Sequence, residues 1–485
     1  MRDFVILINV DDAVSRTMAR RLRAEHIYCQ VLPADTPADV MLNPEVRGIL
    51  VAAASTGLPS ELPHLRDYLQ CGLPMLCMGD AALTLCEVLG GELSDRPLPG
   101  GVEQVRFDHG NVIFDGVEDG ERYLHACRYM TVPQEKASTA AQTEDGVIGF
   151  RVHQRSVWGL AFQLERNDPG GTLLLLNFCR DVCGCTLWWS NQAFIERAKE
   201  AIEQAADGGD ALCALSGGVD SGVCALLGHM ALGSRLHCIF VDTGLMRKGE
   251  AMQVMDFYNV QAGLDLRRID ASEEFLAALQ GVKDAKEKER IIFFLLRDIL
   301  RREAASIPNI RLMIQGTNYS DAMQDSAFPL ELPSEDVRII EPVRELFKDE
   351  VRYIGEELGM SPAMLLRQPF PGSGLASRIM SEVTPEKLAI LREADAIFRY
   401  EITQNNHNRR LWQYFAALSE ASDTDAGYAV TLRAVQAAEG AGGMAARLPN
   451  DLLERVTLEI LSRCPQVNRV LFDLTPSKNY TPMER

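Results

Sequence analysis

The chain has 485 residues, of which 47% are hydrophobic and 24% charged, the balance of a soluble globular protein with two or three domains. Its formal net charge of -19 argues against a general binder of nucleic acids or acidic membranes, so any phosphate chemistry must depend on local clusters of Lys and Arg. The 12 cysteines lack the paired spacing of a zinc site, no apolar run reaches membrane-spanning length, and no signal peptide follows Met1. We therefore expect a cytoplasmic protein with reduced thiols.

The first part of the chain alternates strand-like apolar runs with helical patterns, which favours a parallel sheet with helices on both faces. A polar, glycine-bearing turn at 207–210 is a candidate boundary. The expected elements are a strand at 4–10, a helix at 15–25, strands at 28–32, 48–53, 74–78, 147–153 and 156–162, and a helix at 191–206.

The rest of the chain divides into two further regions. Strands at 211–215, 237–241 and 311–315 alternate with helices up to a Pro/Gly-rich segment at 369–374. Beyond about residue 382 we expect helices at 385–405 and 448–463, a strand at 469–474, and a Gly/Ala-rich loop at 437–446.

A glycine-rich turn joins the strand at 211–215 to a helical pattern at 223–232, and it reads Ser216-Gly217-Gly218-Val219-Asp220-Ser221. The glycines let the backbone turn tightly and approach a phosphate, and the N–H groups that open the helix point at the anion. The two serines can add hydroxyl donors, and Asp220 can hold a Mg²⁺ ion that accompanies the phosphate. This context predicts a nucleotide-phosphate site.

The motif SGGxDS resembles the PP-loop of ATP pyrophosphatases, which split ATP into AMP and pyrophosphate and place AMP on a substrate oxygen. Together with other segments, it makes nearly the whole chain resemble the GMP synthase family. The segments that carry this resemblance are 240–250, 315–317, 340–352, 369–375 and 467–473.

The resemblance implies an α/β fold with three domains. These are a class I glutamine amidotransferase-like α/β domain at 1–190, a doubly wound PP-loop ATP pyrophosphatase domain at 191–381, and a small α+β dimerisation domain at 382–485. It implies a ligase that uses ATP and Mg²⁺ to adenylate a carbonyl oxygen of XMP or an analogue, after which ammonia displaces AMP. Its partners would be the purine-like acceptor, ammonia and a second copy of the chain, with no nucleic acid and no membrane.

The resemblance also implies roles for individual residues. Asp220 and Lys348 would be catalytic, with Asp220 also contacting Mg²⁺, and Lys288 and Arg290 could help to stabilise pyrophosphate. The alternative for Lys288 and Arg290 is a solvated helix face. Contacts to the acceptor would come from Arg378, Lys478 and Thr481. The expected ATP-binding residues are Ser216, Gly217, Gly218, Val219, Asp220, Ser221, Val241, Asp242, Met246, Arg247, Gly316 and Thr317.

The N-terminal domain departs from the family at the positions that hydrolyse glutamine. Gly79 stands where the family has its nucleophilic Cys and Gln163 where it has its His, so Glu165 alone remains of the triad. Glycine cannot form a thioester, and glutamine cannot act as a general base near neutral pH. Leu83 stands where the family has the residue that holds glutamine. Ala53 and Ala54 stand where the family has the glycines of its oxyanion turn.

We therefore expect glutamine hydrolysis to be lost. The alternative is that Cys77, two residues before the nucleophile position, has taken over with another base such as His125. Ammonia would otherwise come from solution or from a separate amidotransferase subunit that docks on the degenerate domain.

The acceptor side departs from the family as well. The segment 326–333 replaces a family loop that contains HHNVGG, and Ser373 replaces the second Pro of the family's P-G-P-G-L run. The loop at 421–427 is shorter than in the family, and the tail at 477–485 differs from the family's tail. Three functions remain open: a GMP synthase-like ligase that still uses XMP, a related ligase with another acceptor, and a non-catalytic nucleotide-binding regulator. The complete PP-loop argues against the third function.

Overall fold

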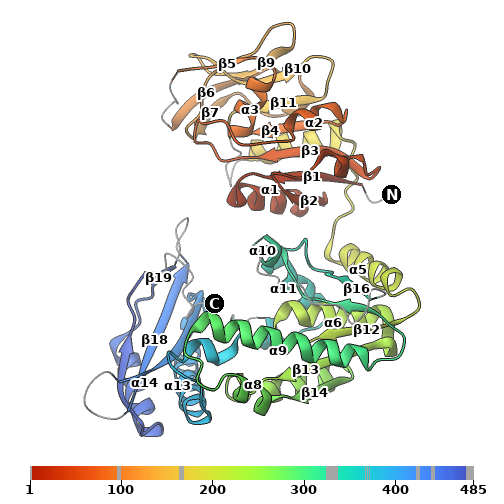
Figure 1. The fold of residues 1–485 in the computed structure, drawn as a ribbon. Helices are drawn as coiled ribbons and strands as arrows, with labels where there is room; N and C mark the ends of the chain where they lie inside the picture. The colour runs from red at the N-terminus through yellow and green to blue at the C-terminus, as the bar shows by residue number, and fades with distance from the viewer. Residues whose placement is uncertain are drawn as a thin grey trace. The chain divides into compact units, whose positions relative to one another are not determined.

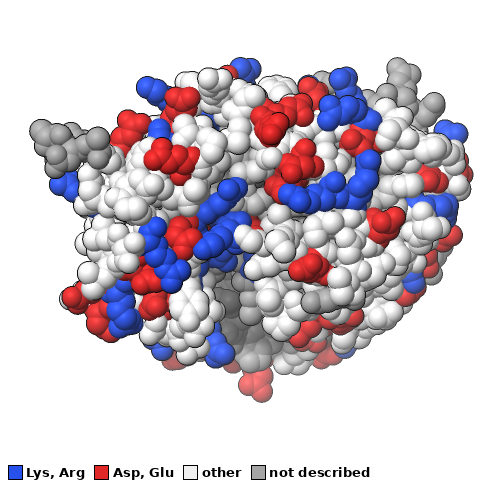
Figure 2. Space-filling model, turned by 90° about the horizontal axis from the view of Figure 1, so that it is seen from below, with Lys and Arg blue, Asp and Glu red and all other residues white. Residues whose placement is uncertain are grey.

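The computed structural model describes residues 3–95, 100–162, 169–323, 337–365, 367–368, 370, 372–421, 427–437 and 443–476. The chain forms two compact units, Met1–Phe194 and Ile195–Arg485 (Figure 1). Within the described residues, no helix has both the length and the apolar character needed to cross a membrane. Charged side chains of both signs are interspersed over the face shown in Figure 2, which carries no continuous basic surface.

The first unit is built on one nine-stranded sheet in the order β2-β1-β3-β4-β11-β10-β9-β6-β7. The strands from β2 to β11 are parallel and the remaining pairs are antiparallel, so the predicted α/β class is confirmed. The strands are β1 (Phe4–Asn9), β2 (Cys29–Pro33), β3 (Val46–Ala52), β4 (Met75–Met78), β6 (Gly101–Phe107), β7 (Gly120–Leu124), β9 (Ala137–Gln142), β10 (Val147–Val152) and β11 (Val157–Leu160), with a separate pair β5 (Glu92–Leu93) and β8 (Met130–Thr131).

The helices of this unit follow from caps and apolar spacing. In α1 the side chain of Asp11 accepts a hydrogen bond from the N–H of Val14 at 3.0 Å, which satisfies one of the free donors at the helix start. The predicted helix therefore begins three residues earlier than its apolar pattern suggested. The helices are α1 (Asp12–Ala24), α2 (Leu65–Gln70), α3 (Asp80–Val88) and α4 (Pro169–Leu176).

The second unit begins with a five-stranded parallel sheet in the order β14-β13-β12-β15-β16. The chain leaves β12 toward β13 on one side and returns to β15 on the other, so the carboxyl end of β12 is the switch point where ligands bind in such sheets. The elements are β12 (Asp210–Ala214), β13 (Leu236–Asp242), β14 (Leu266–Asp270), β15 (Ile310–Ile314), β16 (Arg338–Ile340), α5 (Asn191–Ala206), α6 (Val219–Leu232), α7 (Glu250–Met255), α8 (Ser272–Ala278), α9 (Ala285–Ala305), α10 (Tyr319–Met323), α11 (Lys348–Glu357) and α12 (Pro362–Leu365).

The C-terminal part of this unit is a small sheet with two helices (Figure 1). Thr384 accepts a hydrogen bond from the N–H of Lys387 at 3.2 Å and Pro385 occupies the first turn, which starts α13 as the sequence predicted. The elements are α13 (Pro385–Gln404), β17 (Gln413–Glu420), β18 (Tyr428–Ala437), β19 (Gly443–Ala445), α14 (Asn450–Arg463) and β20 (Val467–Phe472).

The prediction of a loop throughout 437–446 was wrong. Within it, β19 pairs antiparallel with β18, with Ala445 opposite Val435. Glycine and alanine have weak strand propensity, but β18 extends beyond its pairing with β20, and its backbone groups there bind residues 443–445 in the ladder.

One hydrophobic core runs through both parts of the second unit. It includes Leu212 and Met313 from the parallel sheet and Leu391, Phe398 and Val430 from the C-terminal part, all with little or no exposed surface. The small C-terminal sheet therefore packs against the parallel sheet as part of a continuous interior.

Candidate active site

The glycine-rich turn after β12 forms the loop expected from the sequence. Gly217 has φ +79°, a left-handed conformation, and a Cβ there would lie 2.7 Å from a guanidinium nitrogen of Arg367. The two serines organise the loop internally, because the N–H of Ser216 donates to Ser221 Oγ at 3.2 Å and the N–H of Gly218 donates to Ser216 Oγ at 3.2 Å. Helix α6 then starts at Val219.

Gly316, after β15, lets a second strand end approach this loop. A Cβ at Gly316 would lie 2.6 Å from the backbone nitrogen of Ser221 and 2.8 Å from the carbonyl carbon of Asp220. Gly316 therefore packs directly against the backbone of Ser221 and constrains the conformation of the loop.

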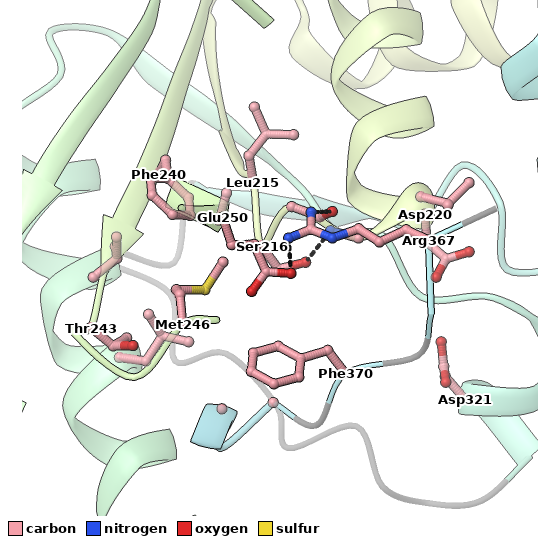
Figure 3. A pocket seen from close by; sticks show the side chains of 18 of the residues that line it. Leu215, Ser216, Asp220, Phe240, Thr243, Met246, Glu250, Asp321, Arg367 and Phe370 are labelled. Carbon is pink, nitrogen blue, oxygen red and sulfur yellow. Dashed lines mark hydrogen bonds and ion pairs between the residues drawn. The ribbon is translucent and has the colours of Figure 1, made fainter. Parts of the chain in front are cut away.

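A cavity of about 550 Å³ opens at the carboxyl ends of β12 and β13. In Figure 3 Asp220 and Asp321 lie on one side of it and Thr243 and Met246 on the other. Of the residues predicted to bind ATP or act in catalysis, those that line the cavity are Ser216, Gly217, Gly218, Val219, Asp220, Val241, Met246 and Lys348. Those that do not line it are Ser221, Asp242, Arg247, Gly316 and Thr317.

Asp220 and Lys348 meet in the cavity although they are far apart in the sequence. Lys348 Nζ, in the first turn of α11, forms an ion pair with Asp220 Oδ2. The other carboxylate oxygen, Asp220 Oδ1, is buried and accepts no hydrogen bond from the described residues. A buried carboxylate oxygen without a donor is suited to a cation, because Mg²⁺ prefers oxygen ligands.

Asp321 is a site residue that the sequence reasoning missed. It lines the cavity on the same side as Asp220 (Figure 3). Burial raises the pKa of the Asp321 carboxyl group, and the negative charge of Asp220 adds to the increase. The signal was present, because Asp321 follows β15 shortly after Gln315-Gly316-Thr317, at the same edge of the sheet as the loop. No group of three or more His, Cys, Asp or Glu side chains among the described residues is arranged to hold a metal alone. A metal there would also need oxygen ligands from the phosphates.

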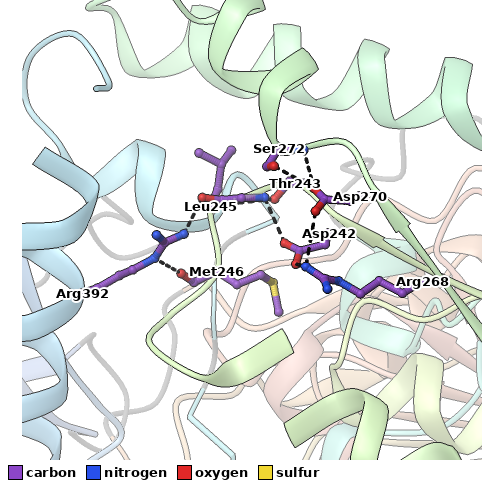
Figure 4. Close-up of polar contacts among 9 residues, drawn as sticks. Asp242, Thr243, Leu245, Met246, Arg268, Asp270, Ser272 and Arg392 are labelled. Carbon is purple, nitrogen blue, oxygen red and sulfur yellow. Dashed lines mark hydrogen bonds and ion pairs between the residues drawn. The ribbon is translucent and has the colours of Figure 1, made fainter. Parts of the chain in front are cut away.

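Asp242 stabilises the loop after β13 (Figure 4). Its carboxylate accepts hydrogen bonds from the N–H of Gly244 at 3.0 Å and from Arg268, whose two nitrogens lie at 2.6 and 3.2 Å. These contacts occupy the carboxylate, so Asp242 affects the cavity through the shape of the loop and does not line it.

Three consecutive carbonyl groups of this loop are bound by donors from residues 375 and 392, and Figure 4 shows the contacts of Arg392. Arg392 of α13 donates to the carbonyls of Gly244 at 2.5 Å and Met246 at 2.9 Å. The N–H of Leu375 donates to the carbonyl of Leu245 at 2.8 Å. These contacts hold the backbone of the loop from which Met246 lines the cavity.

Arg367 is a further cavity residue outside the predicted set. Figure 3 shows its guanidinium group reaching toward Glu250, with which it forms an ion pair, and it also donates to the carbonyl of Gly217. Burial raises the pKa of Glu250, but the charges of Arg367 and Arg247 outweigh this effect and the pKa is lowered overall. Arg367 therefore connects the PP-loop to a buried carboxylate.

Arg247 and Arg378 are buried behind the cavity. Arg247 lies 3.5 Å from Asp395 Oδ2, and Arg378 lies 3.6 Å from Asp395 Oδ1 and above the ring of Phe415 at 4.3 Å. Burial lowers the pKa of Arg247 to about 10 and that of Arg378 to about 9. Arg378, predicted to contact the acceptor, has no exposed surface in this structure.

Lys288 lies away from the cavity. Its ammonium group donates to the carbonyls of Ala376, Ile379 and Ser381 at 3.3, 2.6 and 2.6 Å, and burial lowers its pKa to about 8. The expectation of a solvated helix face was wrong for Lys288, because the side chain has no exposed surface. That expectation fits Arg290, which is exposed and pairs with Glu287 at 2.7 Å.

The turn at Gly79, where the resemblance places the nucleophile, is filled by groups of the chain itself. Gly79 has φ +63°, and a Cβ there would lie 2.5 Å from the carbonyl oxygens of Ala53 and Ala54. The N–H of Asp80, the residue after the nucleophile position, donates to the carbonyl of Ala54 at 2.8 Å. The Asp80 carboxylate accepts from the N–H groups of Thr56 and Gly57 at 2.8 and 3.0 Å.

The alternative nucleophile, Cys77, lies within β4 and has no exposed surface, and burial raises the pKa of its thiol. His125 packs edge-on against the ring of Tyr123 at 5.2 Å. Several predicted residues lie outside the described part of the chain, namely Gln163, Glu165, Lys478 and Thr481, together with the loop at 326–333 and most of the loop at 421–427.

Comparison with known proteins gives one consistent relationship. Residues 400–484 match the family described as GMP synthase C terminal domain. Over 98% of both chains, this chain is 35% identical to a GMP synthase [glutamine-hydrolyzing] of Caldicellulosiruptor saccharolyticus and 32% identical to one of Clostridium kluyveri. Solved structures give weaker likenesses. NMN synthetase from Francisella tularensis is 18% identical with a TM-score of 0.32, over 38% of this chain and 77% of that one. NH3-dependent NAD synthetase from Campylobacter jejuni is 16% identical with a TM-score of 0.31, over 36% of this chain and 76% of that one.

Proposed function

Because this chain belongs to the GMP synthase family, we propose that it is an ATP-dependent ligase that aminates a carbonyl group of a purine nucleotide, XMP or a close analogue. The observation that carries the proposal is the complete PP-loop at the mouth of a cavity that also holds Asp220, Lys348 and Asp321. The acceptor carbonyl oxygen attacks the α-phosphorus of ATP, and the bond to the β-phosphate breaks to release pyrophosphate. Ammonia then attacks the activated carbon, AMP leaves with the oxygen, and the nitrogen loses its extra protons.

The residues of the cavity divide this work. The loop from Ser216 to Asp220, at the start of α6, binds the phosphates, with the helix dipole favouring their charge. Lys348 lies where it can donate to the departing pyrophosphate once the anion competes for its ion pair with Asp220. Asp220 and Asp321 would hold Mg²⁺, which neutralises phosphate charge when bound. Met246 and Thr243 supply the opposite wall.

We further propose that the chain does not hydrolyse glutamine and uses ammonia. Catalysis by an amidotransferase needs a nucleophile on the turn and free N–H donors for the oxyanion. Gly79 supplies no nucleophile, and the carbonyl oxygens beside it leave no space for one. The neighbouring N–H groups are bound by Ala54 and Asp80.

A second candidate is a ligase with the same adenylation chemistry on a different acceptor. It is favoured by the contrast between the ATP-side motifs, which match the family, and the altered segments at 326–333, Ser373, 421–427 and the tail. We retain as proposals the three domains at 1–190, 191–381 and 382–485 and a homodimer formed through the last of them.

Pyrophosphate release tests the proposal. Purified protein is incubated with ATP, Mg²⁺ and ammonium, with XMP or another purine or carbonyl acceptor, and with glutamine in place of ammonium. Release that requires XMP and ammonium, with GMP as product, supports the first candidate. Release with another acceptor alone supports the second. No release with any acceptor, from protein that binds ATP, contradicts both.

A further inference from the structure

A second cavity lies behind the wall of the ATP cavity in the same unit. Its volume is about 650 Å³, and it lies among α7, α12, the end of α13 and Tyr414 of β17. The two cavities share Glu250, Arg367 and Gln368. A volume of this size is typical of sites for small molecules.

Cationic side chains outnumber carboxylates around this second cavity. Lys248, Arg367 and Arg399 line it, against the carboxylates of Glu250 and Asp256. Next to it, Arg247, Arg367 and Arg378 form ion pairs with the buried carboxylates of Glu250 and Asp395. Burial is the main cause of the low pKa of Arg378, and repulsion from Arg247 and Arg399 lowers that pKa further. The cluster therefore has an excess of positive charge that a bound anion would offset.

Arg399 is the member of the cluster best placed to bind such an anion. It lines the cavity, is half-buried, and its Nε atom is buried without a hydrogen bond among the described residues. No carboxylate in the described part of the chain forms an ion pair with it, whereas Lys248, which also lines the cavity, pairs with Glu393. A buried guanidinium nitrogen without an acceptor is costly, and an anionic ligand in the cavity would supply one.

The other walls suit an aromatic heterocycle. Phe257 and Tyr414 are 5% and 4% exposed and line the cavity with apolar ring surface. Gln253, Gln368 and Asn408 contribute amide groups that can both donate and accept hydrogen bonds. One carboxylate, Asp256, also lines the cavity and is exposed to solvent, so its charge is well screened.

We propose that this cavity is a second binding site, specific for a phosphate-bearing molecule of mononucleotide size, with its phosphate on Arg399 and its ring against Phe257 and Tyr414. Because Arg367 forms part of both cavities and donates to the carbonyl of Gly217, occupation of the second site changes the affinity of the PP-loop for ATP. By linkage, ATP changes the affinity of the second site by the same factor.

The test measures binding without turnover. Isothermal titration of the full chain, with the ATP cavity filled by a non-hydrolysable ATP analogue and Mg²⁺, uses XMP, GMP and inorganic phosphate as separate probes. The variants are Arg399→Gln, Arg399→Lys and the control Arg302→Gln, which removes a charge at the exposed end of α9 outside both cavities. Thermal melts establish that each variant is folded.

Arg399→Gln should weaken at least one probe about tenfold or more, the scale of a lost charge-assisted hydrogen bond. Arg399→Lys should weaken it less, and Arg302→Gln should leave it unchanged. Loss of XMP binding identifies the ligand as the acceptor, and loss of GMP binding alone identifies it as the product. An equal effect on inorganic phosphate shows that the phosphate group suffices. The proposal is overturned if no probe binds saturably at millimolar concentration, or if folded Arg399→Gln binds every probe like the wild type.

Discussion

Replacing Gly316 by Ala tests whether the end of β15 sets the shape of the PP-loop. The new Cβ would lie 2.6 Å from the backbone nitrogen and 2.7 Å from the Cα of Ser221, about 0.8 Å short of the roughly 3.4 Å at which such contacts become ordinary. Both neighbours are backbone atoms at the start of α6, which cannot rotate away as a flexible side chain would. The loop must therefore move by several tenths of an ångström.

Displacements of this size at a reacting centre lower rates by about a hundredfold, and overpacking costs about 1–3 kcal/mol of stability. We expect Gly316→Ala to remain folded but to release pyrophosphate about a hundredfold more slowly, in the presence of ATP, Mg²⁺, ammonium and the acceptor. Gly372→Ala is the matched control, because Gly372 lines the same cavity and a Cβ there would meet nothing within 4 Å. Wild-type turnover in folded Gly316→Ala, or an equal loss in Gly372→Ala, would refute the reasoning.

Four further outcomes are expected. Asp220→Ala should lower adenylation by about a hundredfold or more, the scale of a lost charge contact at a phosphate site, and normal ATP turnover in the folded variant would contradict the assignment. Gly79→Cys should release no glutamate from glutamine. It should also melt at a lower temperature than the wild type, because the new Cβ meets two carbonyl oxygens at 2.5 Å. Restored glutaminase activity would show that the site is still competent. The pKa of Lys288 falls from 10.5 to about 8, so between these pH values the unfolded chain binds more protons, and the free energy of unfolding relative to Lys288→Met should rise from pH 8 to 10.5. Urea unfolding of both proteins at pH 7.5 and 9.5 measures this difference, and a decrease would give the wrong sign. Light scattering of the full chain at micromolar concentration should show a dimer, and a monomer would count against a dimerisation role of the region after residue 382.

The sequence predicted most of the elements that position the site. The strands that end at the PP-loop, the loop itself and the start of α13 all have local signals, namely apolar runs, paired glycines and a Thr-Pro cap. These signals act over a few residues, so one sequence is sufficient to locate them.

The partners of the site residues could not be predicted in the same way. Asp242 and Arg247 were expected to bind ATP, yet they contact Arg268 and Asp395, which lie 26 and 148 positions further along the chain. Lys288 was expected to lie near pyrophosphate or in solvent, and it instead binds backbone carbonyls that come within reach only after the chain has folded. Contacts between distant segments leave no periodic pattern in a sequence.

The carbonyls of Gly244, Leu245 and Met246 are all bound by donors from residues 375 and 392, so the loop after β13 depends on the C-terminal part of the chain. A C-terminal region exchanged between relatives must bring an arginine at the position of Arg392 and a matching turn before it, or the loop beside the nucleotide loses its support. Recombination at the apparent boundary near residue 382 would separate Leu375 from Arg392 and break this set of contacts.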